Sequence, residues 1–241
     1  MIDFTTPNPS QSPSSASQLA LTSEALFFQK VYLWMCGGLA LSALVGYWLS
    51  GSEAWIKFLY SGSFSWIILF VVQLGVVYAI GKFKDTLSPI AIKGLFIFYA
   101  ASVGTTMSIV ILIYPSTVIF KAFISTAVIY GGMAAYGLLT KKSLQAWGGF
   151  LFMALIGLIV ASLVNAFTKS PMLDYVICFV GVIIFAALTA YDHQKLRVIH
   201  AGGFQNQDQE SNTVINGALE LYLDFLNLFL FLVRILGASR D

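Results

Sequence analysis

The positions of the charged residues limit this chain more than any other feature. They leave six uncharged stretches, at 31–52, 58–81, 94–120, 122–140, 143–168 and 175–191. Each stretch is close to the ~20 apolar residues that a helix needs to cross ~30 Å of hydrocarbon. A seventh stretch, 214–236, is equally apolar but contains acidic and basic residues. Because helices satisfy their own backbone hydrogen bonds in lipid, the sequence predicts an all-α integral membrane protein with seven transmembrane helices.

The composition supports this fold class. Of the 241 residues, 58% are hydrophobic and only 10% are charged, whereas a soluble domain carries about 25% charged residues. A net charge of +2 gives no strong attraction for nucleic acid. The predicted partner of most of the surface is therefore the lipid bilayer, and no cofactor is expected.

The first 24 residues differ from the rest. Residues 1–18 are rich in Ser and Pro and carry one charge, so we expect 1–24 to be a disordered tail and 25–241 to be the transmembrane domain. The segment lacks a basic n-region and does not resemble a cleavable signal peptide. Basic residues are more frequent, by seven to four, on the side of the membrane shared by Lys30, Lys82, Lys84, Lys141, Lys142, Lys195 and Arg197. By the positive-inside rule this predicts a cytoplasmic N-terminus.

The last apolar stretch carries a polar stripe. At 100° per residue, its polar side chains fall within an arc of about 80° on one helix face: Asn216, Glu220, Asp224, Asn227 and Arg234. A carboxylate at mid-membrane costs ~2.5–3.5 kcal/mol, so these acids are retained for a reason other than insertion. We expect the stripe to face the bundle interior or a water-filled path.

Asp192 lies just beyond the preceding apolar stretch. The two helices are consecutive and antiparallel, so Asp192 meets Asp224 if its helix continues for one or two turns. Together with Glu220 the two aspartates form a candidate Ca²⁺ ligand set. Structural alternatives remain open: Asp192 pairing with Lys195, Glu220 pairing with Lys195 or Arg197, a buried structural Asp224, and an Arg234 that extends to the membrane surface.

Small residues indicate where helices approach each other closely. They are Gly37, Gly38, Gly131, Gly132 with Ala135, and Gly157 with Ala161. We expect them to serve packing within one chain, with a dimer contact as the alternative.

Three segments carry a family resemblance. Leu188-Thr-Ala-Tyr-Asp-His-Gln-Lys195 resembles the sixth-helix signature of the Bax inhibitor-1 family, and the segment from Gly217 through Asp224 and Asn227 is similar to its last helix. The segment from Leu151 to Asn165 is similar to its fifth helix. The likeness covers about 28–237 and favours the bacterial branch, which implies a multi-pass inner-membrane protein.

The resemblance implies six helices around a central seventh and a pH-sensitive Ca²⁺ leak. The family's proposed pH sensor is an aspartate pair, which corresponds to Asp192 and Asp224. In that view protonation breaks the contact and shifts the closed and open populations. Two differences bear on this expectation. His193 replaces the usual Thr beside Asp192. The resemblance to some relatives also implies an arginine in the second helix that locks the two aspartates together, but no basic residue lies in 58–81 of this chain. His193 and Gln73 are therefore candidate modulators.

Two other functions are weighed. Two facing aspartates also occur in intramembrane aspartyl proteases, but Leu221-Tyr222-Leu223 stands where those enzymes have Gly-x-Gly, so we predict no enzyme. The alternative to a leak is an interaction protein that regulates a membrane protease or another membrane protein without transport.

Overall fold

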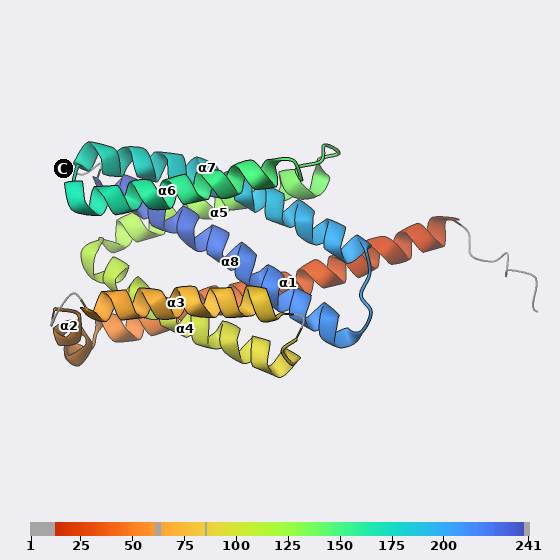
Figure 1. Ribbon diagram of the computed structural model, residues 1–241, viewed down its shortest axis with the longest axis horizontal. Coiled ribbons are helices and arrows are strands. Elements are labelled where there is room, and N and C mark those ends of the chain that lie inside the picture. Colours follow the sequence, from red (N-terminus) through yellow and green to blue (C-terminus); the bar gives the residue numbers. More distant parts are fainter. Residues whose placement is uncertain (1–12, 61–63, 85, 239–241) are drawn as a thin grey trace, which may run out of the picture.

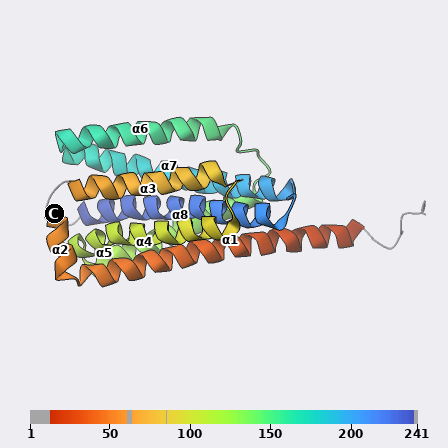
Figure 2. The same ribbon diagram turned by 60° about the horizontal axis from the view of Figure 1, so that its bottom comes forward.

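The computed structural model describes residues 13–60, 64–84 and 86–238, and these residues form eight helices and no strand. The helices are α1 (Pro13–Ser50), α2 (Glu53–Tyr60), α3 (Phe64–Phe83), α4 (Pro89–Ile113), α5 (Ser116–Leu139), α6 (Trp147–Thr168), α7 (Pro171–Ala201) and α8 (Gln207–Ala238). The prediction of an all-α bundle is confirmed. The longer helices run lengthwise through the bundle, and the short α2 crosses one of its ends (Figures 1 and 2).

Six helices are long and apolar enough to cross a membrane: α1, α4, α5, α6, α7 and α8. The apolar stretch Ile68–Phe83 of α3 is shorter. The chain is therefore a multi-pass membrane protein, and α3 as a seventh span remains a prediction.

Proline decides where several helices begin and end. Pro89 and Pro171 each open a helix, and the hydroxyls of Ser88 and Ser170 before them accept hydrogen bonds from backbone N–H groups of the first turn, as helix N-caps do. Pro115 separates α4 from α5, because proline lacks an N–H group and disfavours helical geometry at the residue before it. The predicted span at 94–120 is therefore wrong in its end: the chain turns at Tyr114, and Lys121 lies inside α5.

The predicted tail at 1–24 needs a correction. Residues 1–12 lie outside the described part of the chain, whereas 13–24 form the first turns of α1. Pro13 supplies a favourable first helical position. Later in this segment, Glu24 pairs with Arg197 at 3.2 Å and Ser23 lies 3.2 Å from His200. Contacts with α7 thus accompany a helix that the Ser- and Pro-rich composition did not predict.

α8 lies in the middle of the bundle and packs against α1, α3, α4, α5 and α7. α6 packs mainly against α7 and lies at the edge (Figure 2). Only 11% of the most apolar segment of α6 is buried inside the protein. The expected ring of six helices around the last one is therefore five helices around α8, with α6 in an outer position.

Close helix contacts occur at glycines, though mostly not at those expected from sequence. Gly38 fits the prediction, because an added Cβ would lie 2.7 Å from the Phe96 ring. The tightest contact is at Gly137, where a Cβ would lie 2.3 Å from Ala190 O. Among the described residues, and apart from the backbone of the same helix, no atom lies within 4 Å of a Cβ built at the other predicted positions: Gly37, Gly131, Gly132 and Gly157.

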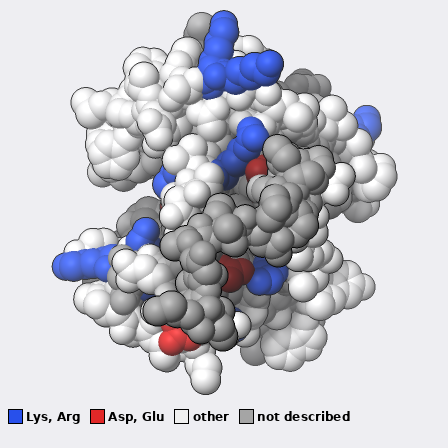
Figure 3. Space-filling view, turned by 90° about the vertical axis from the view of Figure 1, so that its right-hand side faces the viewer, with Lys and Arg blue, Asp and Glu red and all other residues white. Residues whose placement is uncertain are grey.

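The connections alternate between the two ends of the bundle. The α3–α4, α5–α6 and α7–α8 connections lie at one end, the right-hand end in Figure 1. Figure 3 faces this end and shows basic side chains distributed over it, with fewer acidic ones. This is the end that carries the basic pairs of the positive-inside count, and its cytoplasmic placement remains a prediction.

Candidate functional site

The site lies between α7 and α8. α7 continues past the uncharged stretch as far as Ala201, which places Asp192 inside the helix and opposite α8. The carboxyl groups of Asp192 and Asp224 lie within hydrogen-bonding reach of each other. Both residues are buried, with 8% and 4% of their surface exposed. Two ionised carboxylates repel at this range, so a shared proton would stabilise the contact.

Lys195 provides the positive charge of the site. Its Nζ lies 2.7 Å from Glu220 Oε1 on α8 and 3.6 Å from Asp192 Oδ1 on its own helix. Both pairings that the sequence offered for Lys195 are therefore present. Asn216 adds a 3.1 Å hydrogen bond to Glu220 Oε1, whereas Arg197 turns away and donates to Leu138 O at 2.6 Å.

The acidic groups exceed their counter-charge. Three carboxyl groups face one ammonium group, so full ionisation would leave two uncompensated negative charges. Asp224 Oδ2 and Glu220 Oε2 are buried and accept no hydrogen bond from the described residues. Buried acceptors without a donor are costly, so the packing of the described residues leaves these two oxygens unsatisfied.

The three acids do not form a ready-made Ca²⁺ site. Within the described residues, no group of three or more His, Cys, Asp or Glu side chains is arranged to hold a metal ion. The ammonium group of Lys195 lies next to Glu220 and Asp192 and supplies the positive charge there. The predicted Ca²⁺ ligand set of Asp192, Asp224 and Glu220 is thus not assembled in this conformation.

His193 is fully buried beside the acid pair. Its Nδ1 lies 2.6 Å from Thr189 O and donates to it, while Nε2 has no hydrogen-bond partner among the described residues. Rings from two other helices surround the imidazole: Phe28 and Tyr32 of α1, and Tyr130 of α5, with centroids 6.3, 5.8 and 5.6 Å away. The sequence did not point to these rings, because nothing in the spacing of aromatic residues shows which helices meet.

Gln73 does not reach the acids. Its amide nitrogen donates to Ser102 O at 3.0 Å and to Thr106 Oγ1 at 3.1 Å, both on α4. It therefore links α3 to α4. The positive group at the aspartates comes from Lys195 instead.

The last two residues of the polar stripe, Asn227 and Arg234, form their hydrogen bonds away from the acid pair. Asn227 donates to its own helix at Leu223 O, 2.8 Å away. Arg234 forms an ion pair with Asp174 in the first turn of α7, and Asn165 of α6 donates to the same carboxylate. The stripe is therefore divided between two polar clusters, and Arg234 is an interhelical partner rather than a group extended to the membrane surface.

Known proteins are similar to this chain over most of its length. Residues 24–241 match the family model described as inhibitor of apoptosis-promoting Bax1. The chain is 39% identical to inner membrane protein YbhL of Escherichia coli K12, over 89% of this chain and 92% of the relative.

Two further relatives are uncharacterized proteins. One, from Deinococcus radiodurans, is 39% identical over 94% of this chain and 99% of its own length. Another, from Borreliella burgdorferi, is 37% identical over 89% and 93%. The family match and these identities cover nearly the whole described bundle, so the chain belongs to the Bax inhibitor-1 family of membrane proteins.

Proposed function

We propose that this protein is a pH-sensitive Ca²⁺ leak protein of the inner membrane, in which contact between Asp192 and Asp224 holds the closed state. The observation that carries the proposal is the buried contact between these two carboxyl groups on consecutive helices. A contact that depends on a proton is a means of coupling helix position to pH.

The expected direction follows from the number of protons on the pair. One shared proton gives a charge-assisted hydrogen bond and keeps a negative charge near Lys195. A second proton removes that charge, which weakens both the bond and the attraction of Lys195. The helices then separate more readily, so Ca²⁺ flux should rise as the pH falls.

Once α7 and α8 separate, the acidic side chains of α8 would attract cations. Asp224 Oδ2 and Glu220 Oε2 have no donor among the described residues in the closed arrangement, and Asn216 lies one turn from Glu220 on α8. Oxygen ligands of this kind suit Ca²⁺. When Lys195 moves away with α7, these oxygens become free to coordinate a passing ion.

The test is Ca²⁺ entry into dye-filled liposomes that contain the purified protein, measured from pH 5 to 8. Wild type should show flux that rises toward low pH, and Asp224→Asn should show flux with no pH dependence. Glu53→Gln is the matched control, because this carboxylate is exposed on α2 and distant from the pair. Correctly folded wild type without flux at any pH would exclude the leak.

A second candidate is regulation of another membrane protein, such as a protease, without transport. The position of α6 favours it, because this apolar helix packs mainly on α7 and leaves most of its surface open to the bilayer. In that case the protein should crosslink through α6 to a specific membrane protein in cells. Asp224→Asn should leave that crosslink unchanged.

The proposed orientation places the N-terminus and the basic end of the bundle in the cytoplasm. With seven spans the end of α8 is then on the outer side. A phosphatase fused after the last residue should be active outside the cytoplasm, whereas a fusion in the α5–α6 connection should be inactive. The opposite pattern would reverse the orientation.

A further inference from the structure

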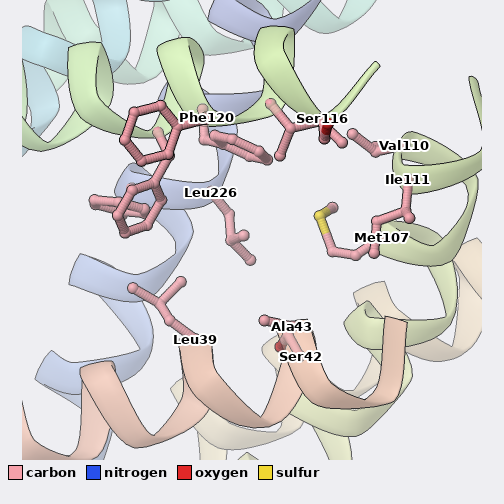
Figure 4. A pocket seen from close by; sticks show the side chains of 13 residues that line it. Leu39, Ser42, Ala43, Met107, Val110, Ile111, Ser116, Phe120 and Leu226 are labelled. Atoms are coloured by element: carbon pink, nitrogen blue, oxygen red, sulfur yellow. The ribbon is translucent and has the colours of Figure 1, made fainter. Parts of the chain in front are cut away.

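An apolar cavity of about 340 Å³ lies between α1, α4, α5 and α8. Figure 4 shows side chains of these helices directed into a common space. Its buried floor consists of Met107 of α4 and Phe225, Leu226 and Phe229 of α8. This volume lies in the range of about 300–1,000 Å³ that is typical of ligand sites.

The lining has almost no polar group to offer a ligand. Two hydroxyls, Ser42 and Ser116, are the polar side chains of the lining. The Ser42 hydroxyl is already bonded to Tyr222 Oη at 2.6 Å and to Ala100 O at 2.7 Å. An apolar cavity of this kind stays dry and accepts apolar ligands, so it does not belong to an ion path.

The mouth of the cavity is continuous with the surface that faces lipid. Phe120 and Phe123 line the cavity and are 66% and 48% exposed. They lie on α5, which is long and apolar enough to span the membrane, and Val128 further along this helix is also exposed. The medium directly outside the mouth is therefore the acyl chains of the bilayer.

We propose that an acyl chain of a bilayer phospholipid enters between α1 and α5 and occupies this cavity. The apolar lining matches the chemistry of a hydrocarbon chain, and the opening into the membrane provides direct access from the surrounding lipid. The site is separate from the acid cluster. Phe225 follows Asp224 in sequence, but its ring packs on Phe123 and Tyr130, with centroids 5.8 and 5.5 Å away.

The test uses full-length protein in phosphatidylcholine vesicles that contain a phosphatidylcholine with a photoactivatable diazirine in the middle of one acyl chain. After illumination, the adducts are located by mass spectrometry. Lipid at the outer surface can reach Phe120 and Val128, whereas only a chain inside the cavity can reach Met107 and Leu226. Adducts on Met107 and Leu226 are therefore the expected result for wild type.

Two variants sharpen the test. Ala43→Trp places a large ring in the cavity from α1 and should reduce the adducts on Met107 and Leu226 by about tenfold. Val128→Trp adds the same ring to the outer face of α5 and should leave them unchanged. Wild-type adducts confined to Phe120, Val128 and other outward residues would overturn the proposal, whether or not the Ala43 variant folds.

Discussion

Lys195 Nζ lies 2.7 Å from Glu220 Oε1, so the charge of α7 is held against a carboxylate of the central helix. The lysine side chain is 37% exposed and the glutamate side chain 25%, which places the pair between a surface ion pair and a buried one. The same ammonium group lies 3.6 Å from Asp192. Lys195 therefore connects the acid pair of the site to the packing of α7 on α8.

Removal of this link should destabilise the bundle only moderately. We expect Lys195→Met and Glu220→Gln each to lower the free energy of unfolding by about 1 kcal/mol, because partial exposure weakens the charge interaction. The double variant should cost less than the sum of the two. Unfolding in sodium dodecyl sulfate with a double-mutant cycle measures the coupling, and additive effects would show that the two groups do not interact.

Loss of the lysine should also change transport if the leak proposal holds. Without its ammonium group, Glu220 loses its ion-pair partner on α7 and Asp192 loses the cation that draws it toward α8. Flux of Lys195→Met at pH 8 should therefore exceed that of wild type. Lys57→Met on exposed α2 serves as the control and should leave the flux unchanged.

The opposite end of the bundle offers a second pair for the same method. Arg234→Met and Asp174→Asn should each cost about 1 kcal/mol or less, since both side chains are more than one third exposed. In a double-mutant cycle, the combined variant should cost less free energy of unfolding than the sum of the two single variants. The pair of Glu53 with Lys57 is the control, because its side chains are 89% and 80% exposed and 3.8 Å apart, and it should show no measurable coupling.

Gly137 should tolerate no larger residue. A Cβ there would lie 2.3 Å from the backbone oxygen of Ala190, so Gly137→Ala must push α5 and α7 apart. We expect a loss of about 1–3 kcal/mol, measured as a lower unfolding midpoint in detergent. Gly132 lies on the same helix, and no atom of another described helix lies within 4 Å of a Cβ built there. Gly132→Ala should therefore stabilise α5 by up to about 1 kcal/mol. Equal effects of the two variants would contradict a close approach of α5 to α7 at Gly137.

A buried hydroxyl pair links the central helix to α1. Tyr222 Oη lies 2.6 Å from Ser42 Oγ, and Ser42 donates to a backbone carbonyl, so the tyrosine hydroxyl acts as the donor to Ser42. Tyr222→Phe should lower the free energy of unfolding by about 1 kcal/mol. Tyr47→Phe, at an exposed position of α1, should have no measurable effect.

Local patterns were sufficient to predict the seven long helices, but they did not predict the short α2 or the first turns of α1, and they gave some boundaries incorrectly. Charges at Lys82 and Lys169 lie near or beyond the ends of helices, as expected for residues at the edge of a membrane. Lys121 does not, because Pro115 interrupts the backbone whatever the hydropathy around it. Pro13 similarly begins a helix inside a Ser- and Pro-rich segment, where composition predicted none.

The sequence alone determined that this chain is a helical membrane protein with acids on one face of its last helix, because hydropathy and helical period are properties of neighbouring residues. The tertiary structure decided which partner each polar group has: Lys195 for Glu220, Asp174 for Arg234 and α4 for Gln73. It also decided that Gly137, rather than Gly132, lies at a contact. These choices depend on how helices are rotated and how closely they approach, which is fixed by the packing of all side chains together and leaves no signal within any one helix.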